Sequence, residues 1–356
     1  MIRRFKVTDF RCIGTADVEL NPGYNLVYGA NASGKTSFLE ALAYLGRGKS
    51  FRGAPTAKLV RHGTSEFVLF GETSLNGRHQ RLGVRNSKDG LEVRVDGSGE
   101  GGVAALAEAL PLQVIDPEIH NLVAGGPEQR RRFVDWVAFH VEHEHLGIWR
   151  RFRRALKQRN AALKGRSGPQ AIRSWNAEFI ELSHELDASR RRSLDVAIDS
   201  LMDHGMGLLG TELGFEYQQG WNREKTLDQA LEEGLERDQQ QGVTQNGPHR
   251  ADLKISYDER QARKLVSRGQ QKLLASAMVL AATETAQTAL ERPLLLLLDD
   301  PAAELDGDSL QRLLDAVTGL GCQVIATSLD REALAMPGGT TTFHVEHGVL
   351  TPVSGP

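Results

Sequence analysis

The eight residues that decide the fold are Gly29, Ala30, Asn31, Ala32, Ser33, Gly34, Lys35 and Thr36. They match the pattern G-x-x-x-x-G-K-[S/T] in full, between a β-prone run at residues 24–28 and a helical pattern that begins at Lys35. The glycines of such a loop let backbone N–H groups turn inward around phosphate oxygens, and the following helix adds its positive N-terminal end. Because a chance glycine-rich turn would lack this strand–loop–helix setting, the segment predicts a phosphate-binding loop.

Two side chains at the end of this loop have expected roles. We expect the ammonium group of Lys35 to neutralise the β- and γ-phosphates of a nucleotide. The hydroxyl of Thr36 is expected to be a magnesium ligand.

A second motif, of the Walker B type, stands near the other end of the chain. Leu294 to Leu298 form a continuous apolar run, as in a buried parallel strand, and Asp299 and Asp300 follow directly. Asp299 is expected to hold magnesium, directly or through water, and Asp300 stands where many ATPases have the carboxylate that orients the attacking water. A buried strand that runs into a loop gives the same pattern, but the phosphate loop earlier in the chain favours the nucleotide-site interpretation.

A third motif opens a predicted helix. Residues 266–272 read Val-Ser-Arg-Gly-Gln-Gln-Lys and resemble the LSGGQ signature of ABC-type ATPases, with Arg268 in place of the first glycine. In that signature, a serine and backbone amides at a helix N-terminus contact the γ-phosphate of a nucleotide held by the other subunit. The alternative is that Ser267 is simply the N-cap of the helix.

Composition and charge limit the classes of protein. The 356 residues suggest two domains, or one large domain with an insertion. Hydrophobic and charged fractions of 40% and 25% are typical of a globular protein and exclude wholesale disorder. The net charge of −3 excludes a globally basic nucleic-acid binder, although it permits a local basic patch. The two cysteines, Cys12 and Cys322, exclude a disulfide framework, a CxxC pair and a cysteine-based zinc site.

The sequence also predicts where the protein works. It has no apolar stretch of about 18 residues, so we expect no membrane span. The first 14 residues lack the apolar core of a secretory signal. We therefore expect a cytoplasmic protein.

Strand-like patterns gather at both ends of the chain, and the middle reads as helix with few strand signals. Strands are predicted at 3–9, 16–20, 24–28, 66–72, 91–96, 294–298 and 323–327, and helices at 35–45, 270–291 and 310–317. The expected fold class is α/β: an ATPase head built from residues 1–122 and 246–356, with a helical lobe of two or three packed helices inserted at 123–245.

The order of phosphate loop, helical insertion, signature and Walker B strand resembles that of ABC ATPases of the SMC and Rad50 type. Further segments resemble the RecF family of bacterial recombination mediators in particular. They are Asp9-Phe10-Arg11, Ser50-Phe51-Arg52, Pro117-Glu118, residues 125–136 (Gly-Gly-Pro-Glu-Gln-Arg-Arg-Arg-Phe-Val-Asp-Trp), residues 157–163, residues 246–253 (Asn-Gly-Pro-His-Arg-Ala-Asp-Leu) and residues 299–306. The segments at 125–136 and 246–253 are the most specific, because generic ABC ATPases lack them.

The resemblance implies roles for individual residues. Residues 29–36 would bind ATP, Asp299 would hold magnesium, and Asp300 would orient the attacking water. Lys35, Asp299 and Asp300 would then be the catalytic residues. Ser267, Gly269 and Gln270 would close over the nucleotide of a partner subunit. The segment Ala303-Glu304-Leu305-Asp306 matches the D-loop and would place Asp306 at the dimer seam, and Arg11 would lie near the nucleotide.

Two departures from the pattern of ABC ATPases predict slow hydrolysis. Thr327 and Ser328 stand after Ile325, where many of these enzymes have a switch histidine. Gln113 is the best candidate for the Q-loop glutamine, although an exposed glutamine at a strand end is an equal alternative. We therefore expect ATP to act as a dimerisation switch, with weak, DNA-dependent turnover.

DNA contacts must come from a local basic surface. Arg150, Arg153, Arg154 and Lys157 share one face of a predicted helix, and they would contact phosphates without reading sequence. Further candidates are Arg151, Arg159, Arg130 to Arg132 and Arg190 to Arg192. The alternative for each is an ordinary solvated side chain or a salt bridge to the acidic region at 224–238.

The resemblance implies a function in recombinational DNA repair, replication maintenance and the SOS response. The protein would be an ATP-dependent dimeric clamp on single-stranded or gapped DNA that helps a RecO–RecR-type mediator load recombinase. The open alternatives are another SMC-like repair ATPase with a short arm, a DNA scaffold with a vestigial ATP site, and a transporter ATPase subunit.

The histidine-rich run at 140–145 forms no HExxH motif, so we expect a solvated polar helix there.

Overall fold

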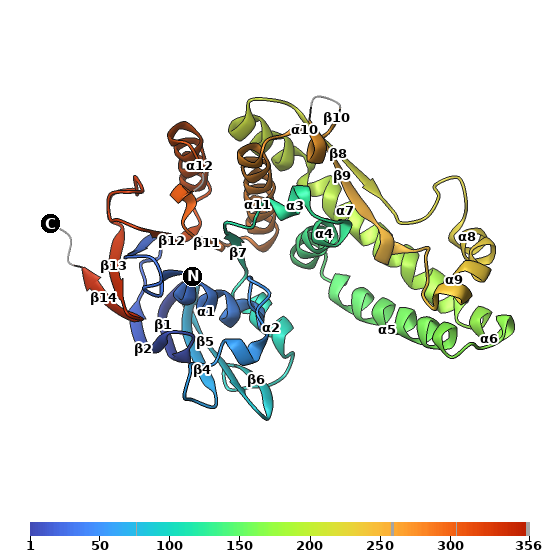
Figure 1. Ribbon diagram of the computed structural model, residues 1–356, viewed down its shortest axis with the longest axis horizontal. Coiled ribbons are helices and arrows are strands. Elements are labelled where there is room, and N and C mark those ends of the chain that lie inside the picture. The colour runs from blue at the N-terminus through green and yellow to red at the C-terminus, as the bar shows by residue number, and fades with distance from the viewer. Residues whose placement is uncertain (76, 258–259, 304, 354–356) are drawn as a thin grey trace. The chain divides into compact units, whose positions relative to one another are not determined.

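The computed structural model of the protein describes residues 1–75, 77–257, 260–303 and 305–353. The chain forms two compact units (Figure 1). The head unit comprises Met1–Ile119 and Glu291–Pro356, and the helical unit comprises His120–Leu290. The head unit is thus assembled from both ends of the chain, as the sequence predicts.

Two sheets form the head unit. The six-stranded sheet has the order β14-β13-β3-β12-β11-β7, in which only the edge pair β13–β14 is antiparallel. Its strands are β3 (Tyr24–Tyr28), β7 (Leu112–Ile115), β11 (Leu295–Leu298), β12 (Gln323–Ser328), β13 (Thr341–Glu346) and β14 (Val349–Val353). Every residue of β11 and β12 is buried, as expected of central parallel strands; β11 is all leucine, and β12 has an apolar centre at Val324, Ile325 and Ala326.

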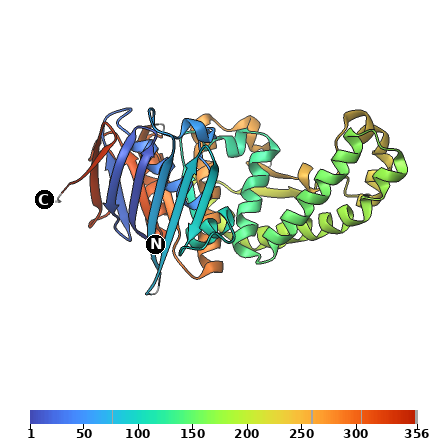
Figure 2. The ribbon, with the colours of Figure 1, turned by 90° about the horizontal axis from the view of Figure 1, so that it is seen from below.

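The second sheet is antiparallel, with the order β2-β1-β4-β5-β6, and Figure 2 shows its strands side by side. They are β1 (Ile2–Phe10), β2 (Ile13–Glu19), β4 (Phe67–Leu75), β5 (Arg78–Ser87) and β6 (Gly90–Val95). Three α-helices and two short 3₁₀ turns complete the described part of the head unit: α1 (Lys35–Arg47), α2 (Val103–Ala109), α12 (Gly307–Gly319), η1 (Thr56–Lys58) and η3 (Pro301–Ala303).

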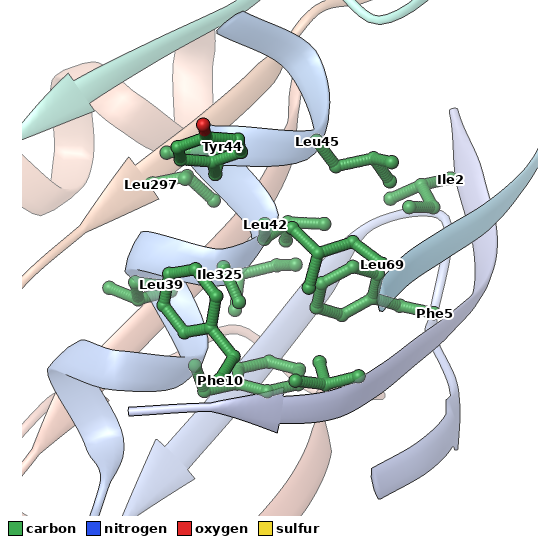
Figure 3. Packing of buried hydrophobic residues seen from close by; sticks show 14 of the residues in the cluster. Ile2, Phe5, Phe10, Leu39, Leu42, Tyr44, Leu45, Leu69, Leu297 and Ile325 are labelled. Atoms are coloured by element: carbon green, nitrogen blue, oxygen red, sulfur yellow. The ribbon is translucent and has the colours of Figure 1, made fainter. Parts of the chain in front are cut away.

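Helix α1 lies in the core between the two sheets (Figure 3). Leu39 and Leu42 of this helix pack in one cluster with Phe5 of β1 and with Leu297 and Ile325 of the parallel sheet. All residues from Phe38 to Gly46 are buried. The phosphate loop therefore leads directly into the most enclosed helix of the unit.

Gln323 of β12 joins the two sheets. Its amide nitrogen donates to the carbonyl oxygens of Ile2 (2.8 Å) and Asn21 (2.7 Å), and its amide oxygen accepts from the backbone N–H of Ile2 (2.9 Å). The side chain is fully buried and all its hydrogen bonds go to the N-terminal part of the chain. A polar residue in an apolar strand is explained by this satisfied network.

The helical unit contains the remaining elements. Its helices are α3 (Asn121–Ala124), α4 (Pro127–Val141), α5 (His145–Lys164), α6 (Pro169–Arg173), α7 (Asn176–Leu209), α8 (Leu227–Glu233), α9 (Leu235–Gln241), η2 (Pro248–Arg250), α10 (Ala262–Leu265) and α11 (Arg268–Leu290). The longest is α7, with 34 residues, and it packs against α4, α5 and α11 (Figure 1). Phe152, Phe179 and Leu186 belong to the apolar cluster between α5 and α7.

Most elements that the sequence predicts are confirmed, including β3, α1, β11, α12 and β12. The prediction missed β8 (Leu213–Gln218), which lies in the predicted helical insertion and pairs with β9 (Asp252–Tyr257). It also gave no strand at β9 or at β10 (Arg260–Gln261), which pairs with β9. It also missed β5, because Arg78–Ser87 is rich in charged and polar residues, and β7, because its four residues include Gln113 and form no continuous apolar run.

Residues 246–290 pack with the helical unit, whereas the sequence-based division assigned them to the head. The reason is the pairing of β9 with β8 and the packing of α11 against α7 and α4. The functional division into head and lobe stays a prediction. Helix α11 is long and apolar enough to cross a membrane, but 72% of its apolar window is buried within the protein.

Candidate nucleotide-binding site

The phosphate loop connects β3 to α1 and makes close backbone contacts that need glycine. A Cβ atom on Gly29 would lie 2.3 Å from the carbonyl oxygen of Val345, so a side chain does not fit there. Gly34 is the N-cap of α1, with a φ of 122°, a backbone conformation that side chains rarely adopt. The two glycines at the ends of the motif are therefore both required by the loop geometry.

Two groups of the loop are arranged to receive an anion. The ammonium of Lys35 folds back and donates to the carbonyl oxygens of Gly29 (2.6 Å) and Ala30 (3.0 Å). The hydroxyl of Ser33 is buried and finds no hydrogen-bond partner among the described residues. Phosphate oxygens would satisfy this hydroxyl, the ammonium and the free N–H groups at the start of α1.

The structure brings Thr36 and Asp299 together, as the sequence predicts. The Thr36 hydroxyl donates to the Asp299 carboxylate (2.9 Å), and the Thr327 hydroxyl donates to the same carboxylate oxygen (3.0 Å). The oxygen of Thr327 also accepts from the backbone N–H of Asp300 (2.9 Å). Thr327, at the position of the switch histidine, therefore holds the acidic strand end in place.

The residues present fit a magnesium ion. Thr36 and Asp299 offer hard oxygen ligands from two elements, and Mg²⁺ is usually bound by one or two protein ligands together with phosphates and water. Burial raises the pKa of Asp299, the negative charge of Asp300 adds to the rise, and the hydrogen bonds from Thr36 and Thr327 oppose it. A divalent cation would relieve the cost of burying this charge.

Asp300 takes a left-handed backbone conformation, with a φ of 49°. Burial raises the pKa of its carboxyl group, and the charge of Lys35 opposes the rise. Asp300 and Lys35 therefore interact electrostatically, which is compatible with a position of Asp300 near the phosphates of a bound nucleotide. Its predicted role toward the attacking water stays a prediction.

Sequence reasoning missed a third carboxyl group, Asp116. It follows β7, whose last residue, Ile115, pairs with Leu298 and accepts from the backbone N–H of Asp299 (2.9 Å). Burial, with the charge of Asp299 adding, raises the pKa of Asp116 to about 6. Only the correct assignment of β7 as a neighbour of β11 could have revealed it.

Gln113 does not lie at the phosphate loop. Its side chain is buried and accepts from Arg47, in the last turn of α1 (2.9 Å). Lys35 begins the same helix 12 positions earlier, about 18 Å away at the rise of an α-helix. Neither the Q-loop interpretation nor an exposed strand end describes this residue.

Arg11 is held beside α1 by a buried carboxylate. Its guanidinium makes two hydrogen bonds to Glu40 (2.8 and 3.0 Å), whose side chain is fully buried. The hydroxyl of Ser50 donates to the same carboxylate. The motifs at 9–11 and 50–52 therefore meet one turn beyond the phosphate loop, and a direct contact of Arg11 with nucleotide stays a prediction.

The signature motif lies in the helical unit and forms a capping box at the start of α11. The backbone N–H of Ser267 donates to the Gln270 side chain (2.9 Å), and the backbone N–H of Gln270 donates to the Ser267 hydroxyl (3.3 Å). Ser267 and Gln270 are exposed, and Gly269 is half-buried. The N-cap interpretation is confirmed, and the contact with a partner's nucleotide stays a prediction.

Asp306 has a local structural role. It is the N-cap of α12, and its carboxylate accepts from the backbone N–H (2.9 Å) and the hydroxyl (2.8 Å) of Ser309. These hydrogen bonds lower the pKa of Asp306. Glu304, the second residue of the predicted D-loop, lies outside the described residues.

The two most specific sequence segments interlock within the helical unit. Arg130 makes a buried, bidentate ion pair with Asp252 (2.7 and 3.1 Å) and donates to the Gly125 carbonyl (2.9 Å). Arg190 pairs with Asp135 (2.7 Å) and donates to the Pro248 carbonyl (2.7 Å). Segments 125–136 and 246–253 are thus structural partners.

Several arginines proposed as DNA contacts are therefore internal. Arg130 and Arg190 are buried in these pairs, and Arg159 is fully buried against Asp238 (2.7 Å). Arg131, Arg132, Arg191 and Arg192 bond to carbonyl or carboxylate oxygens of the same unit. The prediction was wrong for the buried arginines because their carboxylate partners are distant in sequence.

Arg150, Arg153, Arg154 and Lys157 are exposed on α5, and we call these four residues the α5 basic face. Arg153 lies over the ring of Trp149, 4.8 Å from its centroid. For the other three, the structure shows no ion pair within its described ranges. Nearby Arg151 pairs with Glu185 (3.4 Å). The α5 basic face is thus largely free of internal carboxylates.

Within the described residues, no group of three or more His, Cys, Asp and Glu side chains could hold a metal ion. His140 is buried beside the rings of Trp136 and Phe139, and His145 lies 2.9 Å from the hydroxyl of Ser189. The predicted solvated helix was wrong for these two histidines, which are packed inside the helical unit.

We expect the helical unit to lose stability when the pH falls from 6.5 to 4. His249 is largely buried and donates from Nε2 to the Thr244 carbonyl (2.8 Å), and burial lowers its pKa from 6.5 to about 4. Between pH 4 and pH 6.5 the unfolded chain binds more protons at this histidine than the folded chain does. The free energy of unfolding, which is highest above pH 6.5, therefore decreases by about 2–3 kcal/mol as the pH falls to 4.

Urea unfolding followed by tryptophan fluorescence at several pH values tests this expectation. The His249→Gln variant should show a flatter pH dependence than the wild type, and His143→Gln, at an exposed position, should not. Equal slopes for the wild type and His249→Gln would show that His249 does not titrate as described.

Sequence comparisons extend over the whole chain. Residues 1–349 match the family model described as the RecF/RecN/SMC N-terminal domain. A protein of Chromohalobacter salexigens named DNA replication and repair protein RecF is 40% identical over 98% of this chain and 99% of its own length. The protein of the same name from Azotobacter vinelandii is 39% identical over 98% of this chain and 97% of its own length.

Solved structures show the same fold. A structure of the recombination mediator protein RecF with ATP superposes with a TM-score of 0.90 over 99% of this chain and 97% of its own, at 22% identity. A structure of an SMC head bound to a winged-helix domain of ScpA superposes with a TM-score of 0.60 over 99% of this chain and 96% of its own, at 15% identity. The predicted fold class, an SMC-like ABC ATPase head with an inserted lobe, is confirmed.

Proposed function

The chain belongs to the RecF/RecN/SMC N-terminal domain family, and from this premise we propose that it is an ATP-binding and DNA-binding protein of DNA replication and repair. Two relatives named DNA replication and repair protein RecF are 39–40% identical to this chain, and the alignments cover nearly their full length. The proposal includes a cytoplasmic location, action in recombinational repair and the SOS response, and cooperation with RecO–RecR-type proteins that load recombinase.

The observation that carries the proposal is the arrangement of the phosphate loop, Thr36 and Asp299. Lys35 and the orphan Ser33 hydroxyl would bind the phosphates of ATP, and Thr36 and Asp299 would hold magnesium. When bound, the ion would neutralise charge on the phosphates. Asp300 would orient the attacking water, and Thr327 would keep the Asp299 carboxylate in position.

We propose that ATP bridges two copies of the chain. In this arrangement the signature residues Ser267, Gly269 and Gln270 of one copy meet the γ-phosphate held by the phosphate loop of the other, with Asp306 at the seam. The exposure of Ser267 and Gln270 at the start of α11 supports this role. ADP lacks the bridging phosphate, so hydrolysis shifts the population back to monomers.

Turnover is proposed to be slow and stimulated by DNA. Thr327 cannot act as the switch histidine of faster relatives, because its hydroxyl is engaged by Asp299 and Asp300. Slow ATP hydrolysis would keep the ATP-bound dimer closed long enough to hold DNA.

The DNA surface is proposed to be the α5 basic face. Its members contact phosphates, so binding is independent of sequence and weakens with salt. Single-stranded or gapped DNA is the expected substrate.

Sedimentation of the protein with ATP, with ADP or without nucleotide tests the switch, each with and without gapped DNA. We expect ATP to convert monomer to dimer and DNA to travel with the dimer. If neither mass nor DNA binding responds to the nucleotide, the switch mechanism is wrong and a DNA scaffold with a vestigial ATP site is the better description.

The same experiment tests the α5 basic face with a triple variant, Arg150→Ala, Arg154→Ala and Lys157→Ala. We expect this variant to lose DNA binding but to keep ATP-driven dimerisation. For any DNA binding that remains, the slope of log affinity against log salt concentration should be smaller by up to about three units, one for each charge removed. The matched control is Arg85→Ala, Arg173→Ala and Arg223→Ala, which removes the same charge from exposed arginines paired with Glu66, Glu232 and Glu216. Equal DNA loss in both triple variants would contradict the assignment of this face.

A further inference from the structure

Cys12 exposes its thiol beside the phosphate loop, in the turn between β1 and β2. Its sulfur lies 3.5 Å from the hydroxyl of Ser37, the third residue of α1. A Cβ atom on Gly34 would lie 3.3 Å from the same sulfur. The thiol therefore contacts both sides of the segment that contains Lys35 and Thr36.

The backbone around this thiol is tightly enclosed. The N–H of Gly348, in the turn between β13 and β14, donates to the Ser33 carbonyl (2.7 Å). A Cβ atom on Gly348 would lie 2.3 Å from the carbonyl oxygen of Cys12. Three segments thus meet at the phosphate loop, and none can move aside without disturbing the others.

An independent observation indicates that a ligand binds at this place. The Ser33 hydroxyl is buried in the loop and has no hydrogen-bond partner among the described residues. Buried hydroxyls are normally satisfied, so this group, in the residue before Gly34, indicates a ligand with polar atoms at the phosphate loop. Cys12 and the ligand would then occupy neighbouring positions.

We propose that Cys12 is a modification site whose adduct blocks nucleotide from the phosphate loop, an inference that rests on the proposed function. The reactants are the Cys12 thiolate and a small-molecule disulfide. The thiolate attacks one sulfur of the disulfide, the old S–S bond breaks, and the second sulfur leaves with the electron pair as a thiolate. The mixed disulfide on Cys12 is the product, and an added thiol reverses the reaction.

The adduct would compete with nucleotide for space. A new sulfur atom is joined to the cysteine sulfur at about 2.05 Å, and the remainder of the adduct must extend over Gly34 or Ser37 or out into solvent. The Cys12 carbonyl lies close to the Gly348 backbone, which restricts a shift of the turn, and the adduct competes with nucleotide wherever it extends over Gly34 or Ser37. By linkage, bound nucleotide should lower the equilibrium constant for forming the mixed disulfide by the same factor, and it should also slow the modification.

The test uses the full-length protein and dithionitrobenzoate, an aromatic disulfide whose leaving thiolate is coloured. We expect one thiol to react fast, because Cys322 is buried with 3% exposure. After modification, a fluorescent ATP analogue should bind at least about tenfold more weakly, and dithiothreitol should restore binding. ATP with magnesium should slow the reaction of the fast thiol.

Two variants assign the effect to one residue. Cys12→Ser should bind the analogue equally before and after the reagent, and Cys322→Ser should behave as the wild type. Unchanged binding by stoichiometrically modified protein, or no protection by ATP, would overturn the proposal. If the unmodified wild type and Cys12→Ser both fail to bind the analogue, the nucleotide site itself is wrong, which is a distinct result.

Discussion

Replacing Lys35 by Met should abolish ATP binding and, with it, ATP-driven dimerisation. The ammonium donates to the carbonyls of Gly29 and Ala30, and these contacts place it over the loop where phosphates would enter. Hydrogen bonds to charged groups contribute about 1.5–3 kcal/mol each. The loss of two such bonds to phosphate corresponds to about a hundredfold or more in affinity.

Titration with a fluorescent ATP analogue and sedimentation with ATP measure this effect. The matched control is Lys58→Met, which removes an exposed lysine from the head unit and should leave both results unchanged. ATP-dependent dimerisation by the Lys35→Met variant would reject the assignment of this loop. Thermal unfolding of each variant without nucleotide separates lost binding from lost folding.

The second large effect concerns stability. Replacing Asp238 by Ala should destabilise the helical unit by about 3–5 kcal/mol, because it leaves a buried guanidinium without its carboxylate. Arg159 and Asp238 are both fully buried and 2.7 Å apart, and Asp238 also accepts from the backbone N–H of Gln245 (2.9 Å). Arg159 would retain only its neutral partners, Asn176 and Thr244.

Urea unfolding followed by tryptophan fluorescence measures this loss for the helical unit alone. All four tryptophans of the chain, Trp136, Trp149, Trp175 and Trp221, belong to that unit. Asp195→Ala, at an exposed position of α7, is the control and should change stability by less than about 0.5 kcal/mol. The double variant Arg159→Met, Asp238→Leu should recover much of the loss, because neither charge remains buried. A loss below about 1 kcal/mol in Asp238→Ala would contradict this account.

The nucleotide site was largely predictable from the sequence because each half is a local pattern. A glycine-rich loop before a helix and an apolar run before two acids have only a few structural interpretations. Thr36 and Asp299 meet because β3 and β11 end at the same edge of one parallel sheet, with only β12 between them. Asp116 escaped notice because its strand, β7, is short and interrupted by Gln113, whereas the equally short β11 is an unbroken run of leucines.

The basic residues were harder to interpret, for a physical reason. Local sequence shows that Arg130, Arg159 and Arg190 are charged, but not that each has a carboxylate waiting in a distant segment. Asp252 stands 122 positions after Arg130, and Asp238 stands 79 positions after Arg159. Helical spacing correctly grouped the four exposed residues of the α5 basic face, but it did not reveal that Arg159, also a candidate DNA contact, is buried.

The order of the head strands has a consequence for synthesis on the ribosome. Strand β3, which leads into the phosphate loop, has as its only described neighbours β12 and β13, and Gln323 bonds back to Ile2. Almost 300 residues separate β3 from β12, which is about 15–60 s of translation. During that interval β1, β2, β4, β5 and β6 can pair with one another, but β3 has neither of its partner strands, so a nascent chain completes the proposed nucleotide site only when its last hundred residues emerge. A product truncated before β12 would lack Thr327, which holds the Asp299 carboxylate, and could not assemble the proposed ATP site.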